Sequence, residues 1–337
     1  MAINYTNRLE RLKKRRFDPY LNESLLTKAF STSVVPENVK YLAESMQPMD
    51  AASNRRTLEA SENVRNHLER GLNVSFSKTY RHQGSVMVNT NIQVSDIDQL
   101  VIIDSYSFLP TGQDVSSPYV GDPDKDIVEL RRQSIEVLKR QYDIVNDDGS
   151  KSISIYNKNL RRKVDVPFCF WFNSKPYQDS QDEYYRGVYL YNFTESKKGL
   201  DYPFAHIHNV NKKGDRTNDG SRRGIRLLKT LKDDGDIKLS SFQITSIVHS
   251  ISDDELRYSH GQEAAIAQSM SGRIGVLLDN SSLRKELKSP NGNEYPLVDE
   301  SVTQPLKSLK IDLDELILDC KKELRFNYIE KGLKSYV

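Results

Sequence analysis

The strongest fold signal in this 337-residue chain is residues 84–104, GSVMVNTNIQVSDIDQLVIID. The stretch begins with a Gly-Ser pair and ends in a nearly continuous apolar run, which is typical of a strand buried on both faces. Asp96 and Asp98 stand at the start of that run with Ile97 between them. Residues two apart on a strand point to the same side. The sequence therefore predicts two carboxylates presented together at the start of a buried strand, with Ile97 turned into the core.

A third aspartate, Asp165, lies within the alternating stretch RRKVDVPFCFWF at 161–172, which predicts a further strand. Neighbouring carboxylates repel unless a cation lies between them, and carboxylate oxygens are preferred ligands of Mg²⁺, which completes its shell with water and substrate phosphates. If the two strands are adjacent, three aspartates can form a two-metal site that activates a hydroxyl and steadies a leaving pyrophosphate. Gly84 permits close backbone approach, and Ser85 with nearby free amides suits β- and γ-phosphates.

Helical and strand patterns flank these stretches. Apolar residues recur at helical spacing in 54–72 and 124–143, and alternate in 152–157. From about residue 202 the pattern changes. A polar, turn-rich stretch at 211–221 comes first, and helical patterns follow at 224–232, 239–251, 263–279 and 312–332. The first half is therefore predicted to be mixed in α and β structure, and the second half to be α-helical.

Composition and charge exclude several classes of protein. Lys and Arg number 49 against 47 Asp and Glu, and this net charge of +2 disfavours a protein that coats nucleic acid through phosphate contacts. No apolar run approaches the roughly 18 residues of a membrane span, and the basic start lacks the apolar core of a secretory leader. Two cysteines, Cys169 and Cys320, cannot build a disulfide framework or a zinc ribbon. A cytoplasmic protein is the prediction. Leu9 and Leu12 predict a polar helix that lies on a larger body, and the basic cluster at 8–16 fits either a solvated face of that helix or a binding arm.

The order and spacing of these motifs resemble the nucleotidyltransferase superfamily that includes DNA polymerase β. Within it they resemble the branch of cyclic GMP-AMP synthase, oligoadenylate synthase and the bacterial cyclic-oligonucleotide synthases. Residues 84–104 are similar to that branch's GS motif, a following threonine (Thr90) and its metal-binding Asp pair, and VDVPFCF at 164–170 is similar to its third-carboxylate strand. The resemblance covers about residues 83–287.

The resemblance extends to residues 222–250, which are similar to the family's helical-lobe segment. There, a lysine on one helix and a serine on the next reach the donor triphosphate, and a following aromatic stacks on the base. On this chain those positions are Lys229, Ser241 and Phe242.

The fold implied by the resemblance is α+β: a polymerase β-like nucleotidyltransferase core, with a mixed sheet flanked by helices, and a C-terminal α-helical lobe. Residues 1–200 would form the core with N-terminal spine helices, and residues 201–337 a lobe like that of oligoadenylate synthase. A zinc insertion for sensing DNA is absent on cysteine count, so activation by long duplex DNA is not expected.

The implied activity is Mg²⁺-dependent joining of nucleoside triphosphates into a cyclic di- or trinucleotide second messenger, with release of pyrophosphate. The resemblance further implies a role in antiphage signalling beside a separate effector protein that the nucleotide activates, with no membrane partner. Two Mg²⁺ ions, replaceable by Mn²⁺, are the expected cofactors. The implied site divides into the catalytic and metal-binding residues Asp96, Asp98 and Asp165, and the substrate-binding residues Gly84, Ser85, Lys229, Ser241 and Phe242.

Two other functions fit the same residues. One is a template-independent transferase that adds nucleotides to an RNA 3′ end or to a protein side chain. The other is a catalytically degenerate module that binds nucleotides without turning them over. Retention of three candidate carboxylates argues against the degenerate module.

Overall fold

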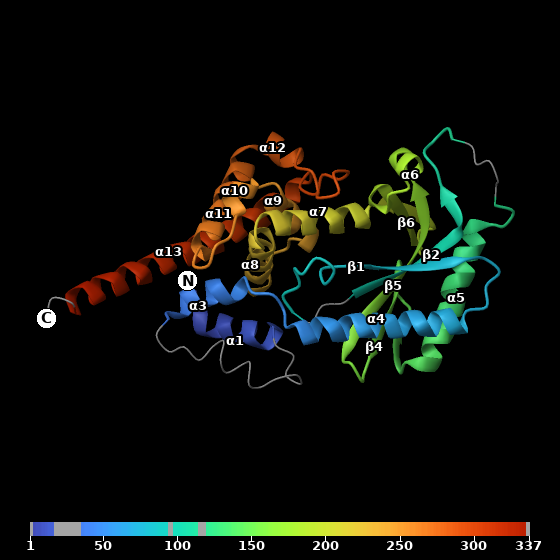
Figure 1. Cartoon of the computed structure of the whole chain (residues 1–337), viewed down its shortest axis with the longest axis horizontal. Helices are drawn as coiled ribbons and strands as arrows, with labels where there is room; N and C mark the ends of the chain where they lie inside the picture. The colour runs from blue at the N-terminus through green and yellow to red at the C-terminus, as the bar shows by residue number, and fades with distance from the viewer. Residues whose placement is uncertain (1–2, 17–34, 94–96, 114–118, 335–337) are drawn as a thin grey trace. The chain divides into compact units, whose positions relative to one another are not determined.

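The computed structural model describes residues 3–16, 35–93, 97–113 and 119–334, with side chains of the last helix described as far as residue 323 (Figure 1). The chain divides into two compact units. The sheet unit comprises residues 51–88 and 94–208, and the helical unit comprises residues 1–50, 89–93 and 209–337. The short segment 89–93 thus belongs to the helical unit although it lies within the motif stretch 84–104.

Within its described part, the sheet unit contains one mixed seven-stranded sheet. Strands β1, β2, β5, β4 and β3 lie in that order, while β6 pairs with β5 and β7 pairs with β6. The printed pairings are antiparallel except for β2 with β5, which is parallel. The strands are β1 (Lys78–Gln83), β2 (Ile97–Phe108), β3 (Ile144–Asn146), β4 (Ser152–Asn157), β5 (Arg162–Asn173), β6 (Arg186–Asn192) and β7 (Lys197–Asp201).

Two helices, α4 (Ala51–Gly71) and α5 (Pro123–Gln141), pack on one face of this sheet (Figure 1). Both were expected from their apolar spacing, and both are confirmed within two or three residues. α5 is capped by the Asp122 side chain, which accepts from the amides of Asp124 and Lys125. Because strand side chains alternate between faces, every second residue of β2 and β5 joins the core under these helices, for example Val101 and Phe168.

The opposite face of the sheet is partly covered by a smaller cluster of buried side chains. Leu100, Ile102, Cys169, Trp171 and Val188 form it. Phe204 packs against it from α7 (Pro203–Arg216), and the sheet unit also holds α6 (Lys175–Ser180) and the 3₁₀ turn η1 (Glu183–Tyr185).

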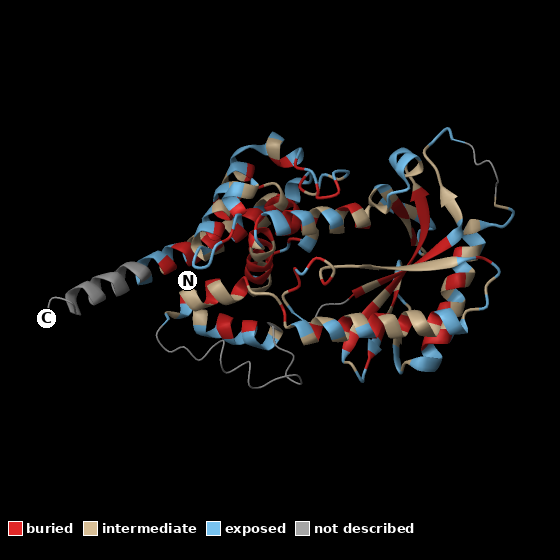
Figure 2. Ribbon diagram, in the orientation of Figure 1, coloured by how far each residue is buried: buried red, intermediate tan, exposed pale blue. Residues whose placement is uncertain are grey.

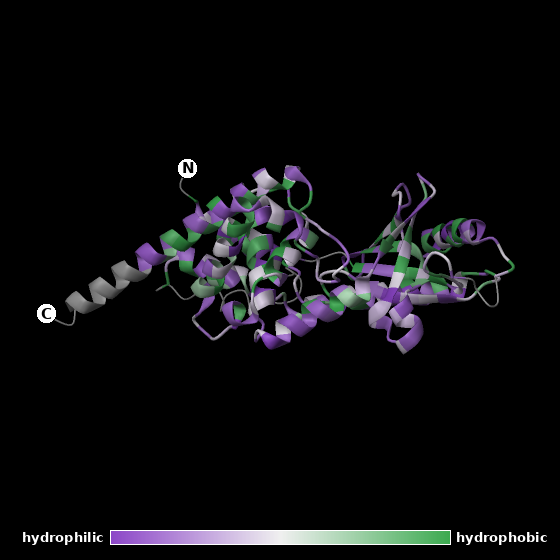
Figure 3. Cartoon of the chain, turned by 90° about the horizontal axis from the view of Figure 1, so that it is seen from above, coloured by the Kyte–Doolittle hydropathy of each residue, from purple (hydrophilic) through white to green (hydrophobic). Residues whose placement is uncertain are grey.

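The helical unit is built around α8 (Gly220–Asp234), whose middle part is buried and red in Figure 2. Its surface helices alternate between hydrophilic and hydrophobic residues, as amphipathic helices do (Figure 3). The other elements are α1 (Tyr5–Arg16), α3 (Glu37–Ser45), α9 (Ser241–His249), α10 (Asp253–Leu256), α11 (Glu263–Asp279), α12 (Ser281–Lys285), η2 (Glu300–Val302) and α13 (Thr303–Lys334). In the described part of the chain, no helix has the length and apolar character needed to cross a membrane.

The N-terminal residues form the predicted polar helix on a larger body, and two cations of the basic cluster take part in the contact. Arg8 pairs with Asp312 at 2.8 Å, and Arg15 pairs at 3.0 Å with Asp234, whose carboxylate also accepts from Tyr41 Oη at 2.6 Å. These cations hold α1 on the helical unit, so for them neither a purely solvated face nor a binding arm is correct.

The polar stretch 211–221, predicted to be rich in turns, is largely helical, and that prediction is wrong. α7 continues to Arg216 and α8 begins at Gly220. The change of direction needs only the residues between them, because Asn218 and Asp219 adopt left-handed backbone angles, with φ of 51° and 67°. Asn and Asp tolerate this conformation better than most residues, which lets two helices meet almost without a loop.

Candidate active site

The two described candidate carboxylates, Asp98 and Asp165, are register partners on the parallel strands β2 and β5. Ile97, beside Asp98, is fully buried in the core under α4 and α5. By alternation, Asp98 and Asp165 point to the opposite face of the sheet, and both are half-buried. The adjacent strands that a shared site requires are therefore present. Asp96 lies outside the described residues.

The Gly-Ser pair follows β1 directly. Gln83, the last residue of β1, is the antiparallel register partner of Asp98, so the turn that starts at Gly84 begins beside this carboxylate. Gly84 has a φ of 113°, which side chains with a Cβ rarely adopt, and this explains the glycine. The Met87 amide donates to the Gly84 carbonyl at 3.2 Å and closes a compact turn that contains Ser85. The structure thus brings Gly84, Asp98 and Asp165 together within one unit.

Asp165 has two side-chain partners. The Ser154 hydroxyl donates to one carboxylate oxygen, and Lys163 Nζ lies 2.9 Å from the other. The Lys163 side chain is 42% exposed, so water or a cation can compete for its place on the carboxylate. Two register-paired carboxylates offer hard oxygen donors, which suit Mg²⁺. Among the described residues, no group of three His, Cys, Asp or Glu side chains forms a complete metal site.

One functional candidate that sequence reasoning missed is Asp201, at the end of β7. Burial raises the pKa of its carboxyl, although the Tyr202 amide donates to it at 2.7 Å and Gln83 Nε2 at 3.3 Å. Both Asp201 and Asp98 lie near enough to Cys169 to raise the pKa of its thiol, which burial already raises. Asp201 therefore lies near Asp98 and the GS turn. A buried carboxyl in a short Lys-Lys-Gly-Leu-Asp strand gives no recognisable sequence signal.

Lys229 lies in the helical unit, on α8, and its side chain is buried. Its Nζ donates to the carbonyl of Thr90 at 3.0 Å, within the segment 89–93. Burial, with a smaller contribution from nearby Lys232, lowers the pKa of Lys229 to about 8. Thr90, the threonine of the motif stretch, is thus in contact with the candidate triphosphate lysine.

Ser241 and Phe242 form the first turn of α9, also in the helical unit. Ser240 caps this helix, since its hydroxyl accepts from the Gln243 amide while the Gln243 side chain accepts from the Ser240 amide. Ser241 is exposed and Phe242 is half-exposed. A capped helix start with an exposed hydroxyl is suited to bind an anion.

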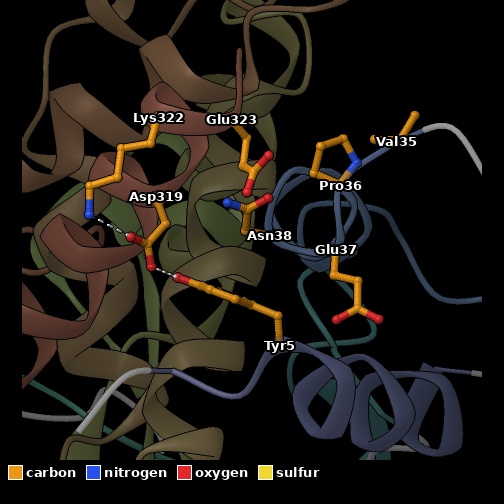
Figure 4. A pocket seen from close by; sticks show the side chains of 8 residues that line it. All are labelled: Tyr5, Val35, Pro36, Glu37, Asn38, Asp319, Lys322 and Glu323. Atoms are coloured by element: carbon orange, nitrogen blue, oxygen red, sulfur yellow. Dashed lines mark hydrogen bonds and ion pairs between the residues drawn. The ribbon is translucent and has the colours of Figure 1, made fainter. Parts of the chain in front are cut away.

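A separate hollow of about 560 Å³ lies in the helical unit, between the N-terminal residues and α13 (Figure 4). Tyr5 Oη donates to Asp319 at 3.0 Å on one of its walls. Among the described residues that line it, Glu37, Asp319 and Glu323 stand against one cation, Lys322. Three carboxylates to one lysine disfavour a triphosphate, so this hollow is not a candidate for the nucleotide site.

Comparison with known proteins identifies close relatives, although no protein-family model matches the chain. A protein of Yersinia aleksiciae named cyclic dinucleotide synthase CdnE is 31% identical over 300 residues, which cover 84% of this chain and 78% of the relative. A protein of a Lachnospiraceae bacterium named c-di-GMP synthase is 30% identical and covers 94% of this chain and 99% of its own length.

Solved structures agree with the sequence relatives. The STING-associated CdnE c-di-GMP synthase from Capnocytophaga granulosa is similar with a TM-score of 0.81 and 29% identity, over 95% of this chain and 100% of that one. The predicted α+β nucleotidyltransferase fold, and the prediction of an enzyme that makes cyclic oligonucleotides, are thereby confirmed. Given relatives of 30% identity or more over most of its length, the chain belongs to the bacterial cyclic dinucleotide synthases, a family of nucleotidyltransferases.

Proposed function

We propose that this protein joins two molecules of GTP into c-di-GMP. The observation that carries the proposal is the register pairing of Asp98 with Asp165 beside the Gly84 turn. The choice of guanine rests on the relatives of 30% and 29% identity that are named c-di-GMP synthases.

The reaction requires two phosphoryl transfers. In each, a ribose hydroxyl oxygen of one nucleotide forms a bond to the α-phosphorus of the other, the bond from that phosphorus to the β-phosphate bridge breaks, and pyrophosphate leaves. The hydroxyl proton passes to solvent. Two GTP thus give one cyclic dinucleotide and two pyrophosphates. Such reactions need positioning and charge neutralisation more than covalent chemistry from the protein.

The roles of the residues follow from their chemistry. Asp96, Asp98 and Asp165 would hold the metal, and Asp165 would also orient the attacking hydroxyl. Gly84 and Ser85 would bind the β- and γ-phosphates through the turn amides and the hydroxyl. Lys229 and Ser241 would contact the donor triphosphate, and Phe242 would stack on its base.

The carboxylate oxygens of Asp98 and Asp165 fit Mg²⁺ or Mn²⁺ in number and type for part of a shell that phosphates complete. When bound, two such ions supply charge neutralisation at the α-phosphate and lower the pKa of the attacking hydroxyl. Lys163 must leave Asp165 for the metal to bind there.

We further propose that the enzyme works in the cytoplasm in antiphage signalling, and that a separate effector protein binds the product. The supporting observation is that the similar c-di-GMP synthase from Capnocytophaga granulosa is STING-associated. We also propose that residues 1–200 act as the catalytic core and residues 201–337 as the helical lobe.

The test is incubation of the full chain with labelled GTP and Mg²⁺, phosphatase treatment, and mass spectrometry of the protected product. A phosphatase-resistant product with the mass of c-di-GMP is expected, and Asp98→Asn and Asp165→Asn should abolish it. Asp104→Asn is the matched control, because Asp104 lies on the same strand and face as Asp98. There an Asn still accepts from Trp171 Nε1, which donates to Asp104 at 2.8 Å.

Three results would overturn the proposal. A fully active Asp98→Asn Asp165→Asn double variant would remove the metal assignment. Label on an RNA 3′ end or on protein, with no small product, would favour a template-independent transferase. Nucleotide binding without turnover in all conditions would favour a degenerate module.

A further inference from the structure

The segment 89–93 lies in the sequence between the GS turn and β2, and two buried cations of α8 hold its backbone. Arg226 Nη1 donates to the carbonyl of Asn89 at 2.6 Å, and Lys229 Nζ donates to the carbonyl of Thr90 at 3.0 Å. Consecutive carbonyls are therefore bound by side chains one helical turn apart, which fixes both the position and the orientation of this short segment.

Arg226 is fully buried, and its three kinds of nitrogen have different partners. Nε donates to the carbonyl of Met46 at 2.7 Å, and Nη2 lies 2.6 Å from the carboxylate of Asp219. A buried cation costs free energy unless it is paired and hydrogen-bonded, and Asp219 supplies the countercharge. The planar fork of arginine reaches three directions at once, which a lysine ammonium cannot reproduce.

Two residues that Arg226 contacts have a left-handed backbone conformation. Asn89 and Asp219 adopt left-handed angles, with φ of 52° and 67°. Asn and Asp adopt this conformation more readily than other residues with a Cβ, and contacts with the surrounding protein hold it in place. Arg226 binds the carbonyl of one and the carboxylate of the other, so a single side chain stabilises both.

We propose that Arg226 is a positioning residue: it fixes the conformation of residues 89–93, which lie in the sequence between the GS turn and β2. This inference rests on the proposed function. Arg226 does not touch substrate, because its guanidinium is enclosed and occupied by protein groups. Lys229 differs, because a triphosphate can compete for its ammonium. If Lys229 leaves the Thr90 carbonyl, Arg226 still holds the segment through the Asn89 carbonyl.

The test is Arg226→Lys in the full chain, with Arg284→Lys as the matched control. Arg284 is also buried in the helical unit, but its guanidinium pairs with Glu300 at 2.5 Å. Arg226→Lys should lower kcat for cyclic dinucleotide formation at least about tenfold with KM for GTP within about threefold, because a misplaced catalytic group slows the chemical step. Hydrogen exchange at the amides of residues 89–93 should become faster, and Arg284→Lys should change neither quantity beyond its effect on the folded fraction.

Two results would overturn the inference: unchanged exchange at 89–93, or an equal loss of kcat in both variants at equal folded fraction. If the wild type makes no cyclic dinucleotide, the proposed function fails, while the exchange measurement still decides the role of Arg226. If Arg226→Lys does not fold, Asp219→Asn replaces it. That variant removes the countercharge and should also speed exchange at 89–93, and unchanged exchange would again contradict the inference.

Discussion

The sheet unit and the helical unit differ in what their charged side chains bind. In the sheet unit, Asp98 and Asp165 are half-buried at a sheet face, and Asp165 is held by a hydroxyl and a half-exposed lysine. In the helical unit, Arg226 and Lys229 are buried and donate to backbone carbonyls. Charges of the first kind can exchange partners with a ligand, whereas those of the second kind hold the backbone, with Lys229 also open to competition from a triphosphate. Substitution of the sheet-unit carboxylates should therefore cost activity with little loss of stability, whereas substitution of the buried helical-unit cations should also change the backbone that they hold.

The largest expected effect is that of Asp98→Asn on turnover. Loss of one metal-binding carboxylate should lower kcat at least about a thousandfold, or ~4 kcal/mol of transition-state stabilisation. The temperature of unfolding should stay the same or rise slightly, because like charges on neighbouring strands destabilise a sheet. Steady-state kinetics measure the loss of kcat, and thermal unfolding measures the change in stability. A large loss of stability with little loss of turnover would reverse the contrast between the units.

In the helical unit, His249 on α9 should make stability depend on pH. Burial, with Lys213 and Arg216 nearby and Asp253 opposing them, lowers the pKa of His249 from 6.5 to about 4. Between pH 6.5 and 4 the unfolded chain binds a proton that the folded chain does not. Stability is therefore complete above pH 6.5 and falls as pH drops through this window, by at most about 3 kcal/mol.

The measurement is the free energy of unfolding in urea at pH 7, 6, 5 and 4.5. His249→Gln is the comparison, since it keeps a polar side chain of similar size without the titration. His67 and His82, whose pKa values are also lowered by burial, contribute equally in both proteins. The slope against pH should be shallower in His249→Gln, and identical slopes would show that His249 is not the group involved.

The sequence allowed the sheet face of the candidate site to be predicted, because strand alternation is a local pattern. Ile97 between two aspartates indicates which side chains share a face, and the apolar runs of β2 and β5 indicate strands buried in the core. Whether these two strands are neighbours could not be predicted from the local pattern, because Asp98 and Asp165 pair across 67 residues of sequence. The resemblance supplied the order of motifs that made this pairing worth expecting.

What the sequence could not indicate is which cations are buried. Arg162 stands in a charge run at 161–163, yet it is buried and donates to Ser53 Oγ at 2.9 Å and Thr57 Oγ1 at 3.0 Å on α4. Arg226 is another such case. The partners that stabilise a buried arginine are distant in sequence, so the residues next to it in the chain resemble those around a solvated arginine. The short strands β6 and β7 were missed for a related reason, since they depend on pairing with β5.

A smaller effect, about 1 kcal/mol, is expected for Asp201→Asn. Burial raises the pKa of Asp201, so the charged carboxylate lowers the free energy of unfolding at neutral pH. Asn carries no charge and removes this loss of stability. Stability should rise at pH 7, and the gain should vanish below pH 3.8, where the carboxyl is protonated in both states. If Asp201 acts in the site, turnover should fall while stability rises. Unchanged turnover would leave Asp201 without a function, and a loss of stability at pH 7 would contradict the cost of its burial.

The smallest effect tests whether the Lys163 ammonium can be displaced from Asp165. Lys163 pairs with Asp165 at 2.9 Å on a partly exposed surface, an interaction of about 0.5 kcal/mol. A metal ion must displace it, so Lys163→Met should lower the Mg²⁺ concentration for half-maximal activity about twofold, since that energy corresponds to such a factor. A Mg²⁺ titration at saturating GTP measures this, with Lys158→Met as a control, because Lys158 pairs with Asp143 away from the carboxylates. A higher Mg²⁺ requirement would mean that Lys163 supports the bound metal or its phosphates. The charges of the sheet unit would then be held as firmly as those of the helical unit.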